Sequence, residues 1–312
     1  MRVLRIAIAL LGGLLLYAVI FQRDLATAMV SKAAGGDQPC PWSRMLRYPW
    51  ETERFSELQN SARRELWVEK DDPQLGIELI RTRGRAFWIK KQGTDLDGRA
   101  LLAYILAEQN WIVENAPGQS VKPGNIVVDV GAHVGSFDDD ALRRGAAKCI
   151  LVEPDPVNVE CIRRNFPREI EQGKIVIVPE GAWSSRSTLE FATGVANSGT
   201  GSFVLHEAGA KTISVPVRPL DEILSDLGIG RVDYIKMDIE GAEREALKGM
   251  AATLLHSKPV LMIDSYHRSD DDVVLPRVIH EANPAYNAVC ATCSPDRLGN
   301  RQRFVPYAVF YN

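Results

Sequence analysis

The chain has 312 residues, enough for one large α/β domain with an extension or for two small domains. A formal net charge of −3 and the lack of any long basic tract in the sequence argue against a nucleic-acid partner. Five cysteines are too few and too scattered for a disulfide-rich scaffold. Cys290 and Cys293 form a single C-x-x-C pair, where we expect packing thiols or a local disulfide rather than a zinc site.

The N-terminus carries an apolar segment. Residues 6–21 contain no charged residue and follow Arg2 and Arg5. As a helix they would extend roughly 24 Å, less than the hydrocarbon core of a bilayer at about 30 Å. We expect residues 1–28 to be an uncleaved signal anchor; the alternative is a signal peptide cleaved near Ala26 and Ala28. The arginines predict a cytoplasmic N-terminus and a lumenal or extracytoplasmic main domain, single-pass or secreted after cleavage.

The rest of the chain divides into three parts. Residues 29–60 show little periodicity and are interpreted as a linker or stem. Residues 61–120 are predicted to form an N-terminal β/α extension, with strands near 66–69, 78–81 and 85–90 and a helix over 101–113. Residues 121–312 are predicted to form the main domain.

Short apolar runs alternate with helical stretches from residue 126 onward. The expected strands cover 126–130, 149–152, 175–178, 234–237 and 260–263, and the expected helices cover 138–144, 156–166, 220–227 and 242–255. This alternation predicts an α/β fold with a doubly wound, mainly parallel sheet and helices on both faces. Strand-like runs at 286–289 and 304–310 are expected to add an antiparallel pair.

A glycine-rich turn follows the first strand of this domain, where Asp129 precedes the pair Gly131 and Gly135. Such a turn lets a ligand approach the backbone, and the following helix offers free N–H groups. A dinucleotide fingerprint would need a third glycine between the two, where His133 stands. The spacing therefore argues against NAD or FAD.

The next strand tips carry further polar residues. Glu153 ends the second strand, 18 residues after Gly135, where an acid is well placed to accept the hydroxyls of a ribose. Glu180 and Gly181 end the third strand and would flank a base, on which Trp183 would pack unless it belongs to the core. Together these tips indicate a nucleoside ligand without a diphosphate.

The fourth strand runs into Asp238, Glu240 and Glu243. The two glutamates suit a helix N-terminus, whereas Asp238 at the strand tip is expected to face the cleft.

The chain resembles the FkbM-type methyltransferases over roughly residues 100–270. The resemblance lies in the glycine turn at 129–135, the strand tip at 152–155 and the acidic stretch at 235–243, together with Arg218-Pro-Leu-Asp-Glu-Ile223 and Leu247-Lys-Gly249. The resemblance implies a class I methyltransferase (Rossmann-like) fold, S-adenosylmethionine as methyl donor and, usually, O-methylation of a sugar or polyketide hydroxyl. The sequence departs from the family at His133, where Asn is commoner, and at the acids 138–140. Including the strand tips above, the expected cofactor-binding residues are Asp129, Gly131, Ala132, His133, Gly135, Glu153, Glu180 and Gly181.

A hydroxyl acceptor needs a group that removes its proton. His267, just beyond the fifth strand, is the first candidate because the ordinary pKa of histidine lies near neutrality, and Asp238 and Asp264 are the alternatives. Asp264, His267 and the acids 270–272 could together form a divalent-metal cluster, but we interpret the acid run as a helix cap and expect no metal. Residues 197–202 are expected to cover the acceptor.

The expected partners are a small-molecule or glycan acceptor and a membrane reached through the N-terminal segment. Two other classes compete. A non-catalytic binding protein would keep the fold without binding the donor. An NAD-dependent epimerase would need the missing glycine and a Tyr-x-x-x-Lys pair, which the sequence lacks at a suitable position.

Overall fold

The computed structural model describes residues 23–82, 84–91, 98–193, 199–205, 209–296, 298–299 and 302–312. The apolar segment at 6–21, expected to be a signal anchor, lies outside these residues. Within the described part of the chain, no helix combines the length and the apolar character needed to cross a bilayer.

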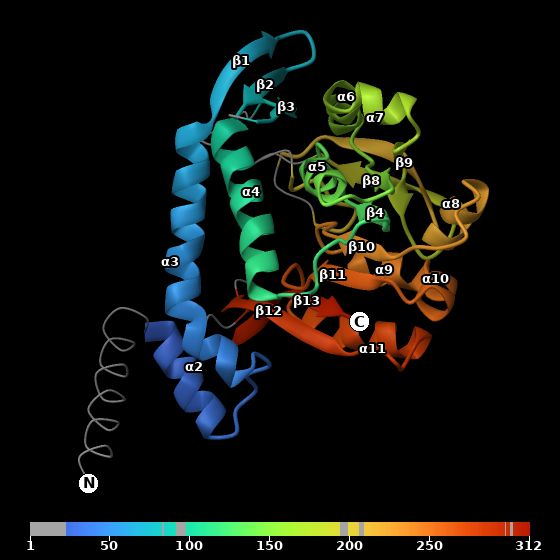
Figure 1. The fold of residues 1–312 in the computed structure, drawn as a ribbon. Helices are drawn as coiled ribbons and strands as arrows, with labels where there is room; N and C mark the ends of the chain where they lie inside the picture. The colour runs from blue at the N-terminus through green and yellow to red at the C-terminus, as the bar shows by residue number, and fades with distance from the viewer. Residues whose placement is uncertain are drawn as a thin grey trace.

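A seven-stranded sheet forms the centre of the molecule, in the order β12-β13-β11-β10-β4-β5-β6 (Figure 1). Its parallel strands are β4 (Ile126–Val130), β5 (Lys148–Val152), β6 (Ile175–Val178), β10 (Tyr234–Met237) and β11 (Val260–Asp264). The last two strands run antiparallel to their neighbours: β12 (Ala288–Pro295) and β13 (Phe304–Tyr311). The predicted sheet and its terminal antiparallel pair are confirmed.

Helices cover both faces of this sheet. Alternate strand residues point to opposite faces, so Cys149 and Leu151 of β5 join one apolar cluster while Ile150 and Val152 join the other. Three helices pack on the first cluster: α4 (Gly98–Asn115), α5 (Ser136–Arg143) and α6 (Pro156–Asn165). Four helices pack on the second apolar cluster: α8 (Leu220–Asp226), α9 (Glu243–Lys248), α10 (Ala251–His256) and α11 (Asp271–Ala282).

The single helix expected over 242–255 is two helices, α9 and α10, with a break at Gly249. Gly249 lies against the backbone that follows β7 (Gly181–Ala182), where a Cβ would sit 2.0 Å from the carbonyl oxygen of Trp183. This close approach requires a residue without a side chain. It is a tertiary contact that the helical pattern alone does not reveal.

The expected linker over 29–60 is instead largely helical. Helix α2 (Arg23–Ala33) leads into α3 (Trp42–Glu65), which runs alongside α4 (Figure 1). Phe55 of α3 packs edge-on against Tyr104 and tilted against Trp111. The sequence of α3 has weak apolar periodicity, so the helix depends on tertiary contacts such as these aromatic ones with α4.

A disulfide joins Cys40, just before α3, to Cys293 in β12, across 253 residues of sequence. Of the two alternatives expected for Cys290 and Cys293, the local disulfide between them is therefore wrong, and packing as a thiol holds for Cys290 alone. Cys290 is a free thiol, with its sulfur 3.6 Å from that of Cys293. The bond ties the N-terminal helices to the edge of the central sheet.

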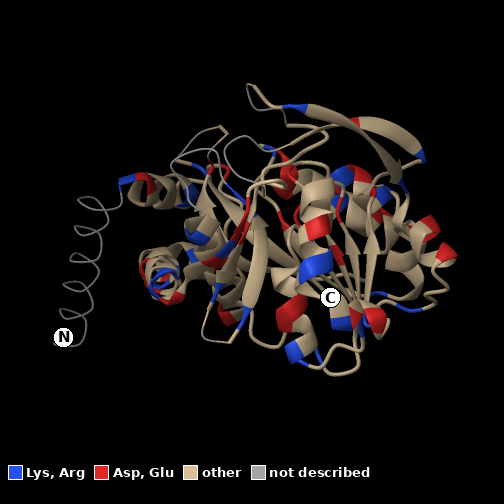
Figure 2. Cartoon of the chain, turned by 90° about the horizontal axis from the view of Figure 1, so that it is seen from above, with Lys and Arg blue, Asp and Glu red and all other residues tan. Residues whose placement is uncertain are grey.

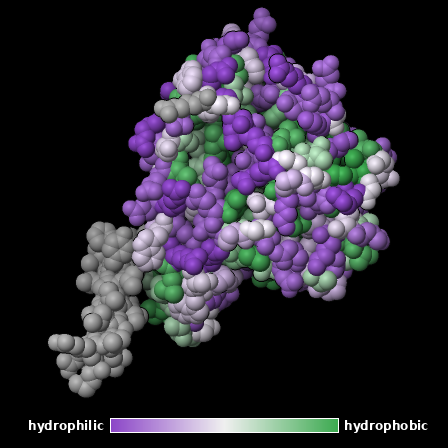
Figure 3. All heavy atoms as spheres, viewed as in Figure 1, coloured by the Kyte–Doolittle hydropathy of each residue, from purple (hydrophilic) through white to green (hydrophobic). Residues whose placement is uncertain are grey.

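Two smaller sheets complete the fold. One is the expected extension, an antiparallel set of β1 (Trp67–Asp72), β2 (Ile77–Arg81) and β3 (Ala86–Lys90). The other contains β7, β8 (Ser187–Ala192) and β9 (Thr212–Arg218), and the short helix α7 (Pro167–Glu171) follows α6. Basic and acidic residues are interspersed over the view in Figure 2, and apolar residues are scattered among polar ones in Figure 3.

Candidate active site

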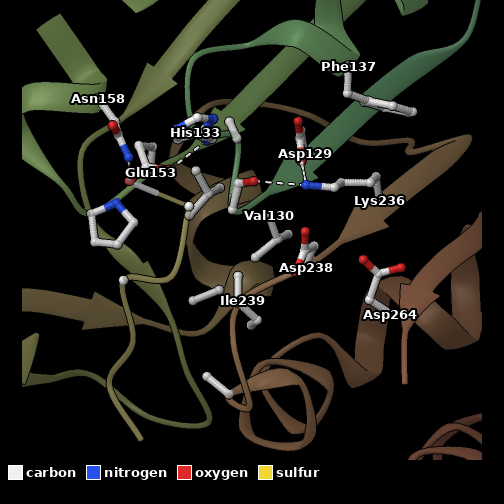
Figure 4. A pocket seen from close by; sticks show the side chains of 18 of the residues that line it. Asp129, Val130, His133, Phe137, Glu153, Asn158, Lys236, Asp238, Ile239 and Asp264 are labelled. Atoms are coloured by element: carbon white, nitrogen blue, oxygen red, sulfur yellow. Dashed lines mark hydrogen bonds and ion pairs between the residues drawn. The ribbon is translucent and has the colours of Figure 1, made fainter. Parts of the chain in front are cut away.

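A cavity of about 970 Å³, including its open mouth, lies at the carboxyl ends of β4, β5, β10 and β11 (Figure 4). This is the edge at which doubly wound sheets bind their ligands. The loop after β4 forms one wall, and residues from α4 form another, namely Ile105, Glu108, Gln109 and Ile112.

The expected glycine loop is shaped by close backbone packing. Gly131 has φ +84°, and a Cβ there would lie 2.0 Å from the carbonyl oxygen of Asp238. Gly135 has φ +81°, and a Cβ there would lie 2.4 Å from the ring of Phe166. Both positions need the left-handed conformation and the missing side chain. As a result the loop is drawn against β10, and its residues Gly131, Ala132 and His133 face the cavity.

Glu153 is buried at the tip of β5 and lines the cavity. Its Oε2 accepts the backbone N–H of His133 at 2.7 Å, and its Oε1 accepts that of Asp155 at 2.9 Å and the amide of Asn158 at 3.3 Å. Burial raises the pKa of the carboxyl to about 8, against the effect of these donors. Oε2 accepts only one of these bonds, which leaves it capacity for a ligand hydroxyl.

A buried charge cluster lies beneath the glycine loop. The ammonium of Lys236 is 3.2 Å from Oδ1 of Asp129 and donates to the carbonyl of Gly131 at 2.9 Å (Figure 4). Burial lowers the pKa of Lys236, but nearby carboxylates, Asp129 first, outweigh burial and hold it above its ordinary value. Lys236 was not among the expected site residues. Its signal in the sequence is a single charge within an otherwise apolar strand.

Asp138, one of the acids that depart from the family pattern, turns inward and is fully buried. Burial and the neighbouring Asp129 hold the pKa of its carboxyl well above the ordinary value. Both effects favour the neutral form of the carboxyl, which does not repel an anionic ligand.

Of the two site residues expected at the tip of the third strand, only one lines the cavity in the described chain. Gly181 lines the cavity. Glu180 instead accepts a hydrogen bond from Nε of Arg218 at 2.5 Å and is not among the lining residues of the described chain.

Aromatic rings reach the cavity from outside the central sheet. Phe191 of β8 and Phe203 both line it, with their centroids 4.9 Å apart. Trp183, expected to pack on a base, contacts Phe203 edge-on from outside the lining. The two phenylalanines were missed because β8, which carries Phe191, and the connection to β9, which carries Phe203, have no local pattern that links them to the site.

The opposite end of the cavity is acidic. Asp238 and Asp264 line it from the tips of β10 and β11. His267 is not a lining residue in the described chain; its side chain is 3% exposed and its Nε2 lies 3.5 Å from Oδ1 of Asp238. Burial lowers the pKa of His267, but carboxylates, Glu243 first, hold it well above its ordinary value.

Helix α4 adds an acid that the sequence did not single out. Glu108 lines the cavity and accepts a hydrogen bond from the hydroxyl of Tyr307. Burial raises the pKa of its carboxyl to about 7. An acid on the apolar face of an amphipathic helix is the signal that could have identified it.

Two further expectations have clear outcomes. Of the loop expected over the acceptor, residues 197 and 198 lie outside the described chain, and Gly199 and Gly201 line the cavity. The acids 270–272 lie at the start of α11, as predicted. Asp270 and Asp271 both pair with Arg244 at 2.7 Å.

Comparison with known proteins agrees with this geometry. The methyltransferase FkbM domain family matches residues 129–285. The chain is 28% identical over 185 residues to methyltransferase sdnD of Sordaria araneosa. The matched region covers 50% of this chain and 70% of that protein.

Among solved structures, similar chains include an FkbM methyltransferase from Methylobacillus flagellatus, with TM-score 0.45 and 19% identity over 84% of this chain. This chain spans only 60% of that protein's length. A SAM-dependent methyltransferase from Agrobacterium tumefaciens has TM-score 0.42 and 13% identity, covering 78% of this chain and 70% of its own. On the strength of the domain match, which covers half of its residues, the chain belongs to the FkbM methyltransferase family.

Proposed function

We propose that the protein transfers a methyl group from S-adenosylmethionine to a hydroxyl of a small-molecule or glycan acceptor. The observation that carries this proposal is a single cavity with two chemically different ends. Glu153 lies at one end, Asp238 and Asp264 lie at the other, and the loop at Gly131 lies between them.

The residues present fit the donor. The free capacity of Glu153 Oε2 suits a ribose hydroxyl, and the rings of Phe191 and Phe203 offer apolar faces to a base. The ammonium of Lys236, above its ordinary pKa and beside the loop, suits the donor's carboxylate. Of the expected cofactor residues, Gly135 and Glu180 are not among the lining residues of the described chain, and Glu180 pairs with Arg218 instead.

The bound sulfonium supplies an electrophilic methyl: the C–S bond breaks with its electron pair left on sulfur, and a lone pair of the acceptor oxygen forms the new C–O bond. The protein's task is to align donor and acceptor and to receive the hydroxyl proton. We assign the proton to Asp238, which borders the cavity. Burial holds the pKa of Asp264 well above its ordinary value, so that this carboxyl is protonated and donates a hydrogen bond to the acceptor.

His267, the first candidate from the sequence, becomes a positioning residue in this scheme. It contacts Asp238 from outside the cavity lining, and its other ring nitrogen is held by Glu243 at 2.9 Å. Polar groups of α4, Glu108 and Gln109, face the same end of the cavity and suit a hydroxyl-rich acceptor.

The test is calorimetric titration of S-adenosylmethionine into the full chain and two matched variants. Glu153→Gln should weaken binding by about tenfold or more, since one of the two carboxyl oxygens that can bind the ribose hydroxyls is replaced by an amide NH₂. Glu180→Gln changes the same chemical group at the neighbouring strand tip and should bind as the wild type does. Absence of donor binding by the folded wild-type protein would favour the non-catalytic binding protein instead.

We also propose that the domain is lumenal or extracytoplasmic and held at a membrane by the N-terminal segment. The Cys40–Cys293 disulfide supports this, because such bonds persist in oxidising compartments. Trp42, Leu46 and Trp50 are exposed at every fourth position of α3, close after the apolar residues 6–21. Carbonate extraction and protease protection of membrane vesicles test both parts; a soluble, protease-accessible cytoplasmic protein would refute them.

A further inference from the structure

One buried nitrogen near the acidic end has no hydrogen-bond partner among the described residues. The side chain of His267 is 3% exposed, and its Nε2 makes no hydrogen bond there. It points at two carboxylate oxygens, Oδ1 of Asp238 at 3.5 Å and Oε2 of Glu240 at 3.6 Å. A buried polar atom without a partner is costly, and most such atoms in proteins are satisfied.

The other ring nitrogen determines which proton the imidazole carries. Nδ1 lies 2.9 Å from Oε1 of Glu243, a fully buried carboxylate. That oxygen also accepts the backbone N–H of Ile239 at 3.0 Å, which fixes its orientation. Nδ1 therefore donates its proton to Glu243, and Nε2 faces Asp238 and Glu240, where a bound cation would take the place of its proton. A carboxylate behind the histidine is the usual support of a metal-binding imidazole.

The distances distinguish a hydrogen-bonded ion pair from a shared ion. Charge-assisted N–H···O bonds are typically about 2.7–2.9 Å long, shorter than either contact of Nε2. Ligand atoms about 2.1 Å from a tetrahedral ion lie roughly 3.4 Å from one another, close to the observed 3.5 and 3.6 Å. All three ligand atoms lie within 4.8 Å of one another.

We propose that Asp238, Glu240 and His267 bind a divalent first-row transition-metal ion, with Glu243 orienting the histidine. One imidazole and two carboxylates suit manganese, iron or zinc better than the all-oxygen sets preferred by magnesium and calcium. The expectation of a metal-free site, made from the sequence, considered His267 together with Asp264 and the acids 270–272, and not with Asp238 and Glu240. Those acids are engaged at the start of α11.

The chemical role of the ion rests on the proposed function. Because Asp238 also borders the cavity, the ion lies at the acceptor end, with an open position toward the acceptor oxygen. It polarises the hydroxyl and lowers its pKa. The proton passes to Oδ2 of Asp238, while Oδ1 binds the ion, and the oxygen lone pair attacks the methyl carbon. The acceptor then leaves as the methyl ether.

The test is titration of Mn²⁺ into the chelator-treated full chain, followed by electron paramagnetic resonance. Mn²⁺ is chosen because it disfavours thiolates, so that the free thiol of Cys290 does not compete as it would for zinc. We expect one site with an imidazole nitrogen signature. His267→Gln should remove that signature and weaken binding at least about tenfold, while His256→Gln, an exposed histidine, should change neither.

Glu240→Gln provides a second variant, since its side chain is partly exposed and less critical for folding than His267. It should weaken Mn²⁺ binding while leaving the nitrogen signature of residual complex intact. No Mn²⁺ site in the wild-type protein, or equal affinity in wild type and both variants, overturns the proposal. Titration of S-adenosylmethionine without metal reports separately on the proposed function, because the donor residues lie at the other end of the cavity.

Discussion

Replacing Glu153 with Gln should change how stability depends on pH. Burial raises the pKa of this carboxyl from 4.5 to about 8 in the folded protein, so the folded state holds the proton more tightly than the unfolded chain does. Its contribution to stability is fully present below about pH 4.5 and is lost as pH rises toward 8. At about 1.4 kcal/mol per unit, the loss amounts to at most about 5 kcal/mol.

The assay is urea unfolding of wild type and Glu153→Gln between pH 5 and 9, with the difference in unfolding free energy as readout. Other buried carboxyls affect both proteins alike, so the difference isolates this one. Wild type should lose stability relative to the variant as pH rises. Parallel pH profiles would refute the reasoning, because they would mean that the three N–H donors compensate fully for burial.

Two further predictions concern stability and the donor loop. Lys236→Met leaves Asp129 buried without its counter-charge and should cost about 3–5 kcal/mol near neutral pH, measured by urea unfolding; a loss below 1 kcal/mol would contradict the charge cluster. Cys40→Ser removes a link across 253 residues and should lower unfolding free energy by up to about 5 kcal/mol, whereas reductant should leave the variant's stability unchanged.

The end of the cavity at Glu153 could be predicted because its signals are local. A strand, a glycine turn and an acid at the next strand tip lie within a short stretch of sequence, and β4, β5 and α5 place Asp129, Gly131 and Glu153 accordingly. Alternation of apolar runs likewise identified the parallel strands, since each strand is buried on both faces.

The remainder depends on contacts between distant residues. The pairing of Cys40 with Cys293 and the packing of Phe55 against α4 have no local pattern. His267 was expected to face the acceptor as a general base. Its Nε2 instead lies beside Asp238 and Glu240, a placement that only the tertiary structure reveals. Residues on one strand tip were predictable, whereas their partners across the cavity were not.

Helix α4 gives the cavity a wall that lies outside the region matched by the family's domain. It supplies this wall through Ile105, Glu108, Gln109 and Ile112. The match to the FkbM domain begins at residue 129. The wall therefore comes from a helix upstream of the matched domain, and this helix packs against α3. A change of side chains on α4 would reshape the cavity without altering the glycine loop.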